Sequence, residues 1–261
     1  LALPQREELK QAVKPFKKAR ILASVLQSPT GTSEMEIILL YLNVLFLLPQ
    51  IAQVYIYNQV KAHQKEAQKL LDLLGEMEVA ISLLRHKRDL EVVCQPVYTE
   101  TGGIEGETLY HPLLSNPIAN DVHFQKNMVI SGDNASGKST YLKTVAINAI
   151  LAQGLGFAYG ETFALPYGHV LTAMDVSDDI EVGDSYFITE SKAILRMIQH
   201  LKEPGFHYFF IDELFKGTNT IERIGSGLGI VRWLAAQNCL YMISSHDIEL
   251  VAASGEVNDN Y

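Results

Sequence analysis

Residues 132–139 have the residue types and spacing of a phosphate-binding loop, G-x-x-x-x-G-K-S. They follow the apolar run 128–130 and precede a helical pattern. Glycines let backbone N–H groups curl around phosphate oxygens, and the start of the next helix adds partial positive charge. We therefore expect Lys138 to reach the β- and γ-phosphates of a nucleotide and the Ser139 hydroxyl to bind Mg²⁺. The predicted nucleotide contacts in this stretch are Gly132, Asp133, Asn134, Ala135, Ser136, Gly137, Lys138, Ser139 and Thr140.

Two carboxylates, Asp212 and Glu213, follow a second apolar run at residues 208–211. Acids at the carboxyl end of a parallel strand face the usual ligand crevice of an α/β sheet. Asp212 is predicted to hold the Mg²⁺ shell and Glu213 to act as the general base that polarises the attacking water. Taken alone, the pattern also fits an ordinary strand followed by solvated acids. The phosphate-binding loop upstream favours the catalytic interpretation, with Lys138 as a further catalytic residue.

His246 follows a third apolar run, at residues 240–243. A histidine at the end of a neighbouring strand can sense a γ-phosphate by donating a hydrogen bond. A lone histidine is more often a satisfied structural residue. Because the phosphate-binding loop and the two carboxylates occur in the same chain, a catalytic role for His246 is favoured.

The elements that must position these residues alternate between short apolar runs and helical stretches at residues 139–155, 191–201 and 224–236. This alternation predicts an α/β fold with a mixed, mostly parallel sheet flanked by helices. Earlier in the chain, residues 97–99 and 108–110 flank three glycines, which predicts a β-hairpin.

The first part of the chain has a helical pattern at residues 6–26, turn residues at 28–33, an apolar run at 37–48 and a long helical pattern at 51–90. An antiparallel helical hairpin is the favoured interpretation. A membrane span needs about 20 apolar residues, so the run fits a buried helix better, although a span over residues 37–57 stays an alternative. The expected apolar stripe of the long helix comprises Leu70, Leu73, Leu74, Met77, Ile81 and Leu84.

Charge divides the 261 residues in the same way as the element pattern. Residues 1–95 hold 12 basic and 10 acidic side chains, whereas residues 96–261 hold nine and 20. We therefore expect a helical domain over 1–95 and an α/β domain over 96–261. A net charge of −9 argues against general binding to nucleic acid, and 48% apolar residues exclude wholesale disorder.

Two cysteines and no visible secretory signal predict a cytoplasmic protein. The first residue, Leu1, indicates a fragment or a processed product.

Five ordered motifs resemble the ATPase domain of the MutS mismatch-repair family, and this resemblance covers about the last 160 residues. The phosphate loop with Asn134 inside it is one of these motifs. The helical first part resembles the lever helices of the family only loosely, by position and pattern. The other matching segments are residues 110–112 with 118–121, 177–187 with its serine-bearing signature, 212–220, and 244–247.

The resemblance implies an ABC-type P-loop NTPase that hydrolyses ATP with Mg²⁺ and works as a homodimer with composite sites. In such a dimer, Gly183 and Ser185 of one protomer complete the site of the other over the γ-phosphate. Ile118 is the candidate for packing on the base, because Pro117 stands where the family has an aromatic residue. Lys216 replaces a typical arginine, and Asp184 a typical basic residue, which puts the communication between protomers in doubt.

The predicted function is therefore that of an ATPase module in a mismatch-repair or DNA-damage-sensing protein, which couples its ATP state to the binding of double-stranded DNA. Other repair proteins are possible partners. Two alternatives stay open: a membrane-associated MutS-like ATPase, and a nucleotide-driven dimerisation switch with negligible turnover. Another ABC-type DNA ATPase is disfavoured by the signature and loop sequences.

Overall fold

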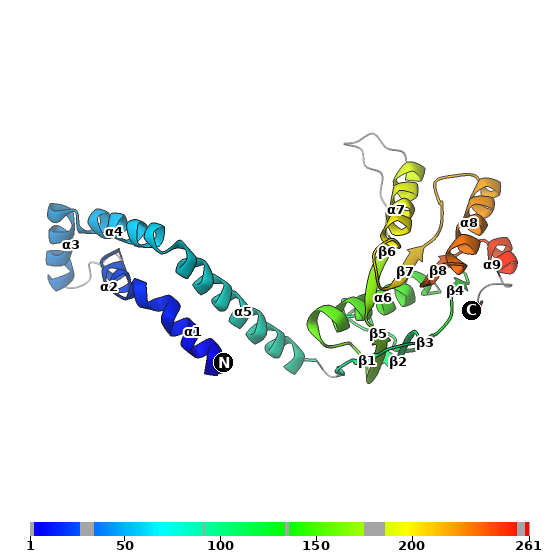
Figure 1. Ribbon diagram of the computed structural model, residues 1–261, viewed down its shortest axis with the longest axis horizontal. Coiled ribbons are helices and arrows are strands. Elements are labelled where there is room, and N and C mark those ends of the chain that lie inside the picture. Colours follow the sequence, from blue (N-terminus) through cyan, green and yellow to red (C-terminus); the bar gives the residue numbers. More distant parts are fainter. Residues whose placement is uncertain are drawn as a thin grey trace. The chain divides into compact units, whose positions relative to one another are not determined.

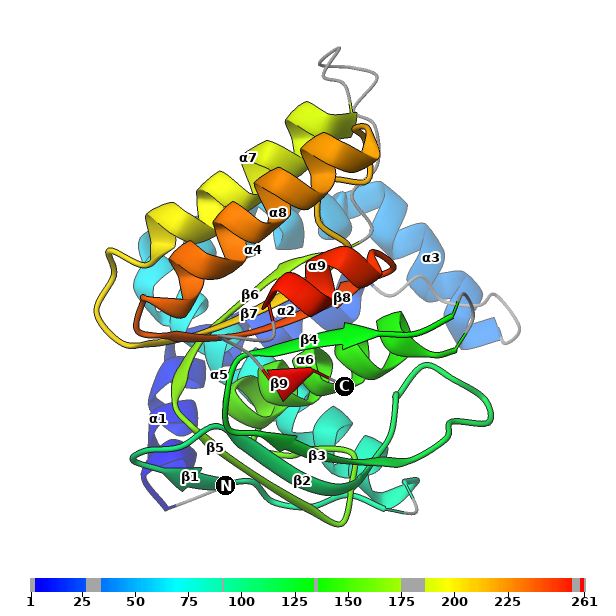
Figure 2. The same cartoon turned by 90° about the vertical axis from the view of Figure 1, so that its right-hand side faces the viewer.

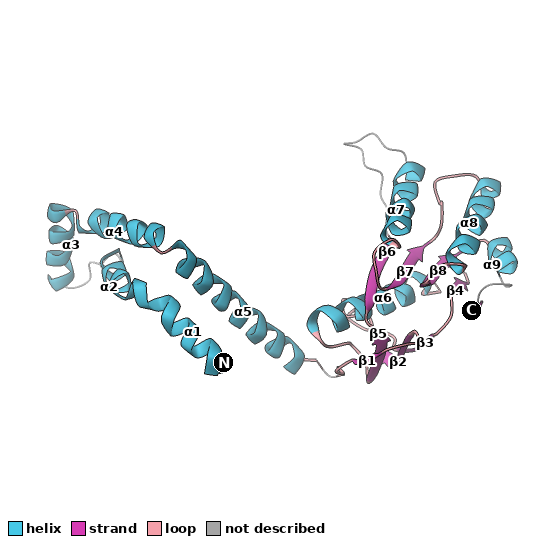
Figure 3. Cartoon of the chain, in the orientation of Figure 1, coloured by secondary structure: helices cyan, strands magenta, loops and turns pink. Residues whose placement is uncertain are grey.

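The computed structural model describes residues 3–26, 34–90, 92–133, 136–174, 186–254 and 259–260. The chain forms two compact units, Leu1–Asp89 and Leu90–Tyr261 (Figure 1). The described part of the first unit is helical, and the second unit combines strands and helices (Figure 3).

In the first unit the chain folds back on itself as an antiparallel helical hairpin. Its first arm consists of α1, a single 3₁₀ turn η1, and α2, and its second arm consists of α4 and α5. The helix α1 packs along α5 and α2 packs along α4 (Figure 1), and an ion pair of 3.5 Å joins Lys69 Nζ of α5 to Glu8 Oε2 of α1. The elements are α1 (Leu3–Val13), η1 (Lys14–Phe16), α2 (Lys17–Leu26), α3 (Glu34–Phe46), α4 (Leu48–Ala62) and α5 (Gln64–Arg88).

The predicted single helix over residues 51–90 is wrong, because the chain breaks at His63, whose φ of −124° and ψ of 47° are not helical. The apolar run 37–57 is also divided, since Leu47 adopts a left-handed turn between α3 and α4. Pro49 lies in the first turn of α4, where its missing N–H costs no helical hydrogen bond. Among the described residues, no helix is long and apolar enough to cross a membrane.

The predicted apolar stripe of α5 is buried only in part. Leu73 is buried, whereas Leu74, Ile81 and Leu84 are exposed within this unit. Periodicity correctly placed these side chains on a helix, but the first arm of the hairpin covers only a portion of them.

A five-stranded parallel sheet forms the centre of the second unit, with strand order β6-β7-β8-β4-β9. Every residue of β8 is buried, as expected for a parallel strand covered on both faces. The register places Asp212 opposite Ser244 and Ser131 opposite Ser245, so the carboxyl ends of β7, β8 and β4 lie together. The strands are β4 (Met128–Ser131), β6 (Gly168–Ala173), β7 (Phe206–Asp212), β8 (Cys239–Ser245) and β9 (Asp259–Asn260).

Helices cover both faces of this sheet (Figure 2), as the alternation of apolar runs and helices predicts. In β7, Tyr208 and Phe210 pack into a core with α6, while Phe209 and Ile211 pack into a second core with α7 and α8. Successive side chains of this strand therefore point to opposite faces of the sheet and pack into two different hydrophobic cores. The helices are α6 (Lys138–Leu155), α7 (Tyr186–His200), α8 (Thr220–Ala235) and α9 (Ile248–Ser254).

A second sheet, with strand order β1-β5-β2-β3, corrects the predicted hairpin. The strand β1 pairs in parallel with β5, while β2 pairs antiparallel with both β3 and β5. A Cβ on Gly103 would lie 1.8 Å from the carbonyl oxygen of Phe124, so this glycine permits a close backbone approach of β2 to β3. Cys94, near the end of the range 1–95 predicted as the helical domain, forms an isolated antiparallel β-bridge with Ala158. The cysteines Cys94 and Cys239 both have free thiols. The strands are β1 (Val97–Thr99), β2 (Ile104–Leu109), β3 (Asn120–Phe124) and β5 (Thr162–Pro166).

Three histidine side chains lie close together near the amino-terminal ends of β6 and β7. From their contacts we predict how the stability of the protein changes at acidic pH. The rings of His169 and His207 stack with centroids 4.9 Å apart, and the His200 ring lies 5.8 Å from that of His207. Burial lowers the pKa of His207, and the two neighbouring histidines lower this pKa further. Because the unfolded chain then binds more protons below its own histidine pKa, stability falls as the pH drops through that range. We expect His207→Gln to reduce the loss of melting temperature between about pH 7 and pH 5.

Thermal unfolding followed by circular dichroism at several pH values measures this effect. The exposed His86→Gln, on α5, is the control, because it removes a histidine outside the cluster. An unchanged pH dependence in His207→Gln would contradict the prediction.

Candidate functional site

The described residues of the predicted phosphate-binding segment, residues 132–133 and 136–137, lie between β4 and α6 and are referred to below as the glycine loop. Ser136 N donates to Asp133 O at 3.2 Å. Gly137 immediately precedes α6 with a φ of 97°, a region that strains residues with a side chain. The first N–H groups of a helix have no partner within it, so the start of α6 can receive an anion. Asn134 and Ala135 lie outside the described residues.

Lys138 is buried, and its ammonium group lies within the glycine loop. Its Nζ donates to Gly132 O at 2.6 Å and to Asp133 O at 2.8 Å. The same Nζ lies 3.4 Å from His246 Nδ1. The structure therefore brings a cation from the start of α6 together with the histidine that follows β8.

Ser139, Asp212 and Ser244 share one set of hydrogen bonds. The carboxylate oxygen Asp212 Oδ1 accepts from Ser139 Oγ at 2.7 Å and from Ser244 Oγ at 2.5 Å. Hydroxyl and carboxylate oxygens are the ligands that Mg²⁺ prefers. The described residues contain no group of three or more histidine, cysteine or acidic side chains able to hold a metal. Mg²⁺ commonly uses one or two carboxylates together with substrate phosphates, so this donor set fits it.

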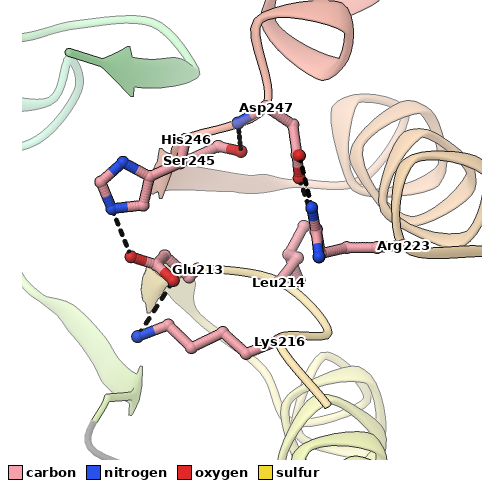
Figure 4. Close-up of a pocket in the computed structure, with 7 residues that line it drawn as sticks. All are labelled: Glu213, Leu214, Lys216, Arg223, Ser245, His246 and Asp247. Atoms are coloured by element: carbon pink, nitrogen blue, oxygen red, sulfur yellow. Dashed lines mark hydrogen bonds and ion pairs between the residues drawn. The ribbon is translucent and has the colours of Figure 1, made fainter. Parts of the chain in front are cut away.

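Glu213 leaves β7 in a left-handed conformation with a φ of 61°. A non-glycine residue in this conformation carries roughly 1–2 kcal/mol of strain, which the surrounding contacts must hold. Its backbone N donates to both the carbonyl and the hydroxyl oxygen of Ser244, each at 3.2 Å. Its carboxylate lies 2.7 Å from His246 Nε2 and 3.1 Å from Lys216 Nζ (Figure 4).

His246 connects Lys138 with Glu213 through its two ring nitrogens. The Lys138 ammonium can only donate, so Nδ1 is the acceptor in that contact. Nε2 then carries the proton and donates to the Glu213 carboxylate. One imidazole therefore joins the glycine loop to the acid at the end of β7.

A cavity of about 230 Å³ lies beside Glu213 and His246. On one side of it, Arg223 of α8 binds Asp247 through two hydrogen bonds of 2.7 Å (Figure 4). These bonds lower the pKa of Asp247 and keep its carboxylate charged. This bidentate pair ties the segment after β8 to α8, which fixes the backbone next to His246. The cavity is lined by Glu213, Leu214, Lys216, Arg223, Ser245, His246 and Asp247.

Other predicted site residues are not brought into these contacts. Ile118 is 83% exposed on the segment before β3. Thr140 lies in the first turn of α6, where its carbonyl accepts from Thr144 Oγ1 at 2.7 Å. Gly183 and Ser185 lie outside the described residues.

Two residues that contact the site, Ser244 and Arg223, had no predicted role, and both carry hydrogen bonds there. Lys216 was expected to affect communication between protomers, and the structure pairs it with Glu213. The position of Ser244 at the end of an apolar run was a usable signal, because the same reasoning selected His246. Arg223 has no comparable signal in the sequence.

The part of the chain that holds these contacts matches a known protein family. Residues 128–260, just over half of the chain, match the model of MutS domain V. The chain belongs to the MutS family. The matched range holds the glycine loop and all the residues joined to it above, so the resemblance predicted from the motifs is confirmed.

Relatives of this MutS-family chain include proteins from a mammal and from bacteria. "MutS protein homolog 4" of Homo sapiens is 29% identical over 202 residues, which cover 74% of this chain and 21% of that protein. "DNA mismatch repair protein MutS" of Thermotoga petrophila is 27% identical over 201 residues, covering 74% and 25%. The protein of the same name from Leuconostoc mesenteroides is 29% identical over 208 residues, covering 76% and 24%. The chain spans about a quarter or less of the length of these relatives.

Proposed function

We propose that the second unit is an ABC-type P-loop ATPase module, which binds ATP with Mg²⁺ and hydrolyses its β–γ bond. The observation that carries this proposal is the meeting of two cationic or proton-donating groups, two acids and a hydroxyl at the carboxyl ends of β4, β7 and β8. These groups come from three separate segments and are linked by contacts of 2.7–3.4 Å. They are Lys138, Ser139, Asp212, Glu213 and His246.

Binding of the triphosphate rests on the glycine loop and Lys138. The loop can offer backbone N–H groups to phosphate oxygens, and the Lys138 ammonium can exchange its bonds to Gly132 O and Asp133 O for bonds to phosphate. Because the ammonium is buried, its interaction with a phosphate is screened less than it would be in water.

The Ser139 hydroxyl and the Asp212 carboxylate are the groups that would hold Mg²⁺. The metal, when bound, neutralises negative charge on the β- and γ-phosphate oxygens. Ser244 donates to Asp212 and thereby orients its carboxylate toward Ser139. Orientation of this kind by a neighbouring hydrogen bond is a common way to tune a metal ligand.

Glu213 is the proposed base for the attacking water. The water oxygen bonds to the γ-phosphorus, the bond from that phosphorus to the bridging oxygen breaks, and ADP leaves, while the water proton passes to the Glu213 carboxylate. Glu213 can accept that proton at a free lone pair of either carboxylate oxygen, or by exchanging its contact with His246 for a contact with water. The Nε2–H of His246 is then available to donate to a γ-phosphate oxygen.

The finer parts of the proposal rest on family membership and on the resemblance of the motifs. The module would act as a homodimer, in which Gly183 and Ser185 of one protomer face the γ-phosphate bound by the other. The bacterial relatives are named as DNA mismatch repair proteins. We extend this to a role in DNA mismatch repair or damage sensing, with the helical unit as the lever between ATP state and double-stranded DNA. Ile118 remains the proposed contact for the base.

Isothermal titration calorimetry of the protein with ATP and with ADP tests the nucleotide site. We expect uptake of nucleotide in the presence of Mg²⁺ and weaker ATP binding after chelation with EDTA, because Ser139 and Asp212 would lose the metal that links them to the phosphates. If folded protein takes up neither nucleotide with Mg²⁺ present, the proposal fails.

A further inference from the structure

The five residues after β7, residues 213–217, form a strained segment that carries the proposed base at its first position. Glu213 and Phe215 both have left-handed backbones, with φ of 61° and 57°. Backbones of this kind persist only when surrounding contacts hold them. We call this segment the base loop.

The two ends of the base loop are held by different elements. At its start, Glu213 N donates to Ser244 of β8. At its end, the buried carboxylate of Glu190 on α7 accepts one backbone N–H at each oxygen. Lys216 N lies 3.1 Å from Oε1, and Gly217 N lies 3.2 Å from Oε2.

The helix α7 also holds the middle of the base loop. Phe187, one turn before Glu190, packs its ring against Phe215 with centroids 5.6 Å apart. Phe215 and Leu214 are both buried in the core that α7 and α8 share. The apolar contact fixes the position of the loop, and the two amide hydrogen bonds fix its direction.

Glu190 is an ionisable residue in a buried position, which is unusual for a side chain with a purely structural role. Its side chain is only 5% exposed, and burial raises its pKa. The two amides and the nearby charge of Lys216 oppose that rise, whereas the charge of Glu213 adds to it. A buried acid whose two oxygens each bind one amide of the same loop restricts that loop more than an apolar side chain of similar size could.

We propose that Glu190 is a positioning residue for Glu213: its carboxylate holds the end of the base loop, so that the Glu213 carboxylate stays beside His246. This inference rests on the proposed ATPase function, in which Glu213 is the base. Glu190 lies on a different element from the glycine loop and has a separate set of contacts, so its loss leaves the nucleotide-binding groups in place.

Steady-state ATP turnover and nucleotide affinity of Glu190→Gln test the proposal. Glutamine keeps the shape of the side chain, but its NH₂ group opposes one of the two amides, so one hydrogen bond is lost. A displacement of about 1 Å in a catalytic group can lower a rate on the order of 100-fold. We therefore expect kcat to fall by about 10- to 100-fold while KM and the Kd for ATP stay within about twofold of wild type.

Two further variants separate positioning from stability. Met197→Ala, in the buried core of the same helix, should lower the melting temperature and leave kcat unchanged below that temperature. Glu190→Asp keeps the charge, but its shorter side chain cannot reach both amides, so we expect a loss of kcat here as well. This variant also covers the case in which Glu190→Gln does not fold.

The outcomes distinguish this proposal from the proposed function. If wild type hydrolyses ATP but folded Glu190→Gln and Glu190→Asp keep full kcat, the positioning role is wrong and the ATPase function stands. Equal losses of kcat and of ATP affinity would also overturn it, because they indicate a general structural role. If wild type itself shows neither ATP binding nor turnover, the proposed function is what fails.

Discussion

Glu213→Gln is expected to lower ATP turnover by about 10²- to 10⁴-fold, the range that general-base catalysis contributes, while ATP still binds. Glutamine keeps the size of the side chain and can accept a hydrogen bond from His246, but it cannot take a proton from water. The groups proposed to bind the nucleotide, Lys138 and the glycine loop, keep their hydrogen bonds. Binding and chemistry should therefore separate in this one variant.

Release of inorganic phosphate measures the loss of turnover, and calorimetry measures retained ATP binding. Size-exclusion chromatography with light scattering, in the presence of ATP and Mg²⁺, should show an ATP-bound dimer that persists because hydrolysis no longer resolves it. Glu249→Gln, an exposed acid in the first turn of α9, is the matched control and should behave as wild type. Unchanged phosphate release from Glu213→Gln would show that another group is the base.

The central contacts of the candidate site could be anticipated from the sequence because the three motifs each follow an apolar run. In a parallel sheet those runs end at one edge, so residues far apart in the chain come together there. The observed register, with Asp212 opposite Ser244, brings the acid of the second motif to the strand of the third. Local sequence thus predicted both the strands and the edge at which their chemistry lies.

Strand order and side-chain partners depended on long-range pairing, which local patterns do not encode. The position of β8 between β7 and β4 makes Ser244 a partner of Asp212. Glu190 is separated from its amide partners by 26 and 27 residues, and nothing at position 190 marks it as an acceptor for a loop. The hairpin prediction failed for the same reason, since Gly103 serves a close contact with β3 and not a turn.

The contacts around Glu213 also show why its surroundings are restrictive. Its backbone is held from β8 by Ser244, and its carboxylate is shared between His246 and Lys216. Lys216 belongs to the segment whose amides Glu190 binds. A shift of α7 would therefore be transmitted to the base through the loop, whereas a shift of α6 would reach it through Lys138 and His246.

Lys138→Ala is expected to weaken ATP binding by about 10- to 100-fold or more, because hydrogen bonds to charged groups contribute about 1.5–3 kcal/mol each. The change removes the cation proposed to meet the phosphates and also the donor to Gly132 O and Asp133 O, so the glycine loop loses its own internal support. Turnover should fall to background, because the contact with His246 Nδ1 is lost as well.

Lys138→Arg sharpens this prediction, because arginine keeps the charge but carries a planar, bulkier head group. The ammonium fits among two carbonyl oxygens and an imidazole nitrogen at 2.6–3.4 Å within a buried site, and a guanidinium cannot occupy that space without moving the loop. We therefore expect impaired ATP binding in both variants, measured by calorimetry, with the exposed Lys202→Ala as the control. Wild-type ATP affinity in folded Lys138→Ala would mean that the triphosphate does not lie against this loop. A phosphate bound there would lose its interaction with the buried Lys138 ammonium, and the affinity for ATP would fall.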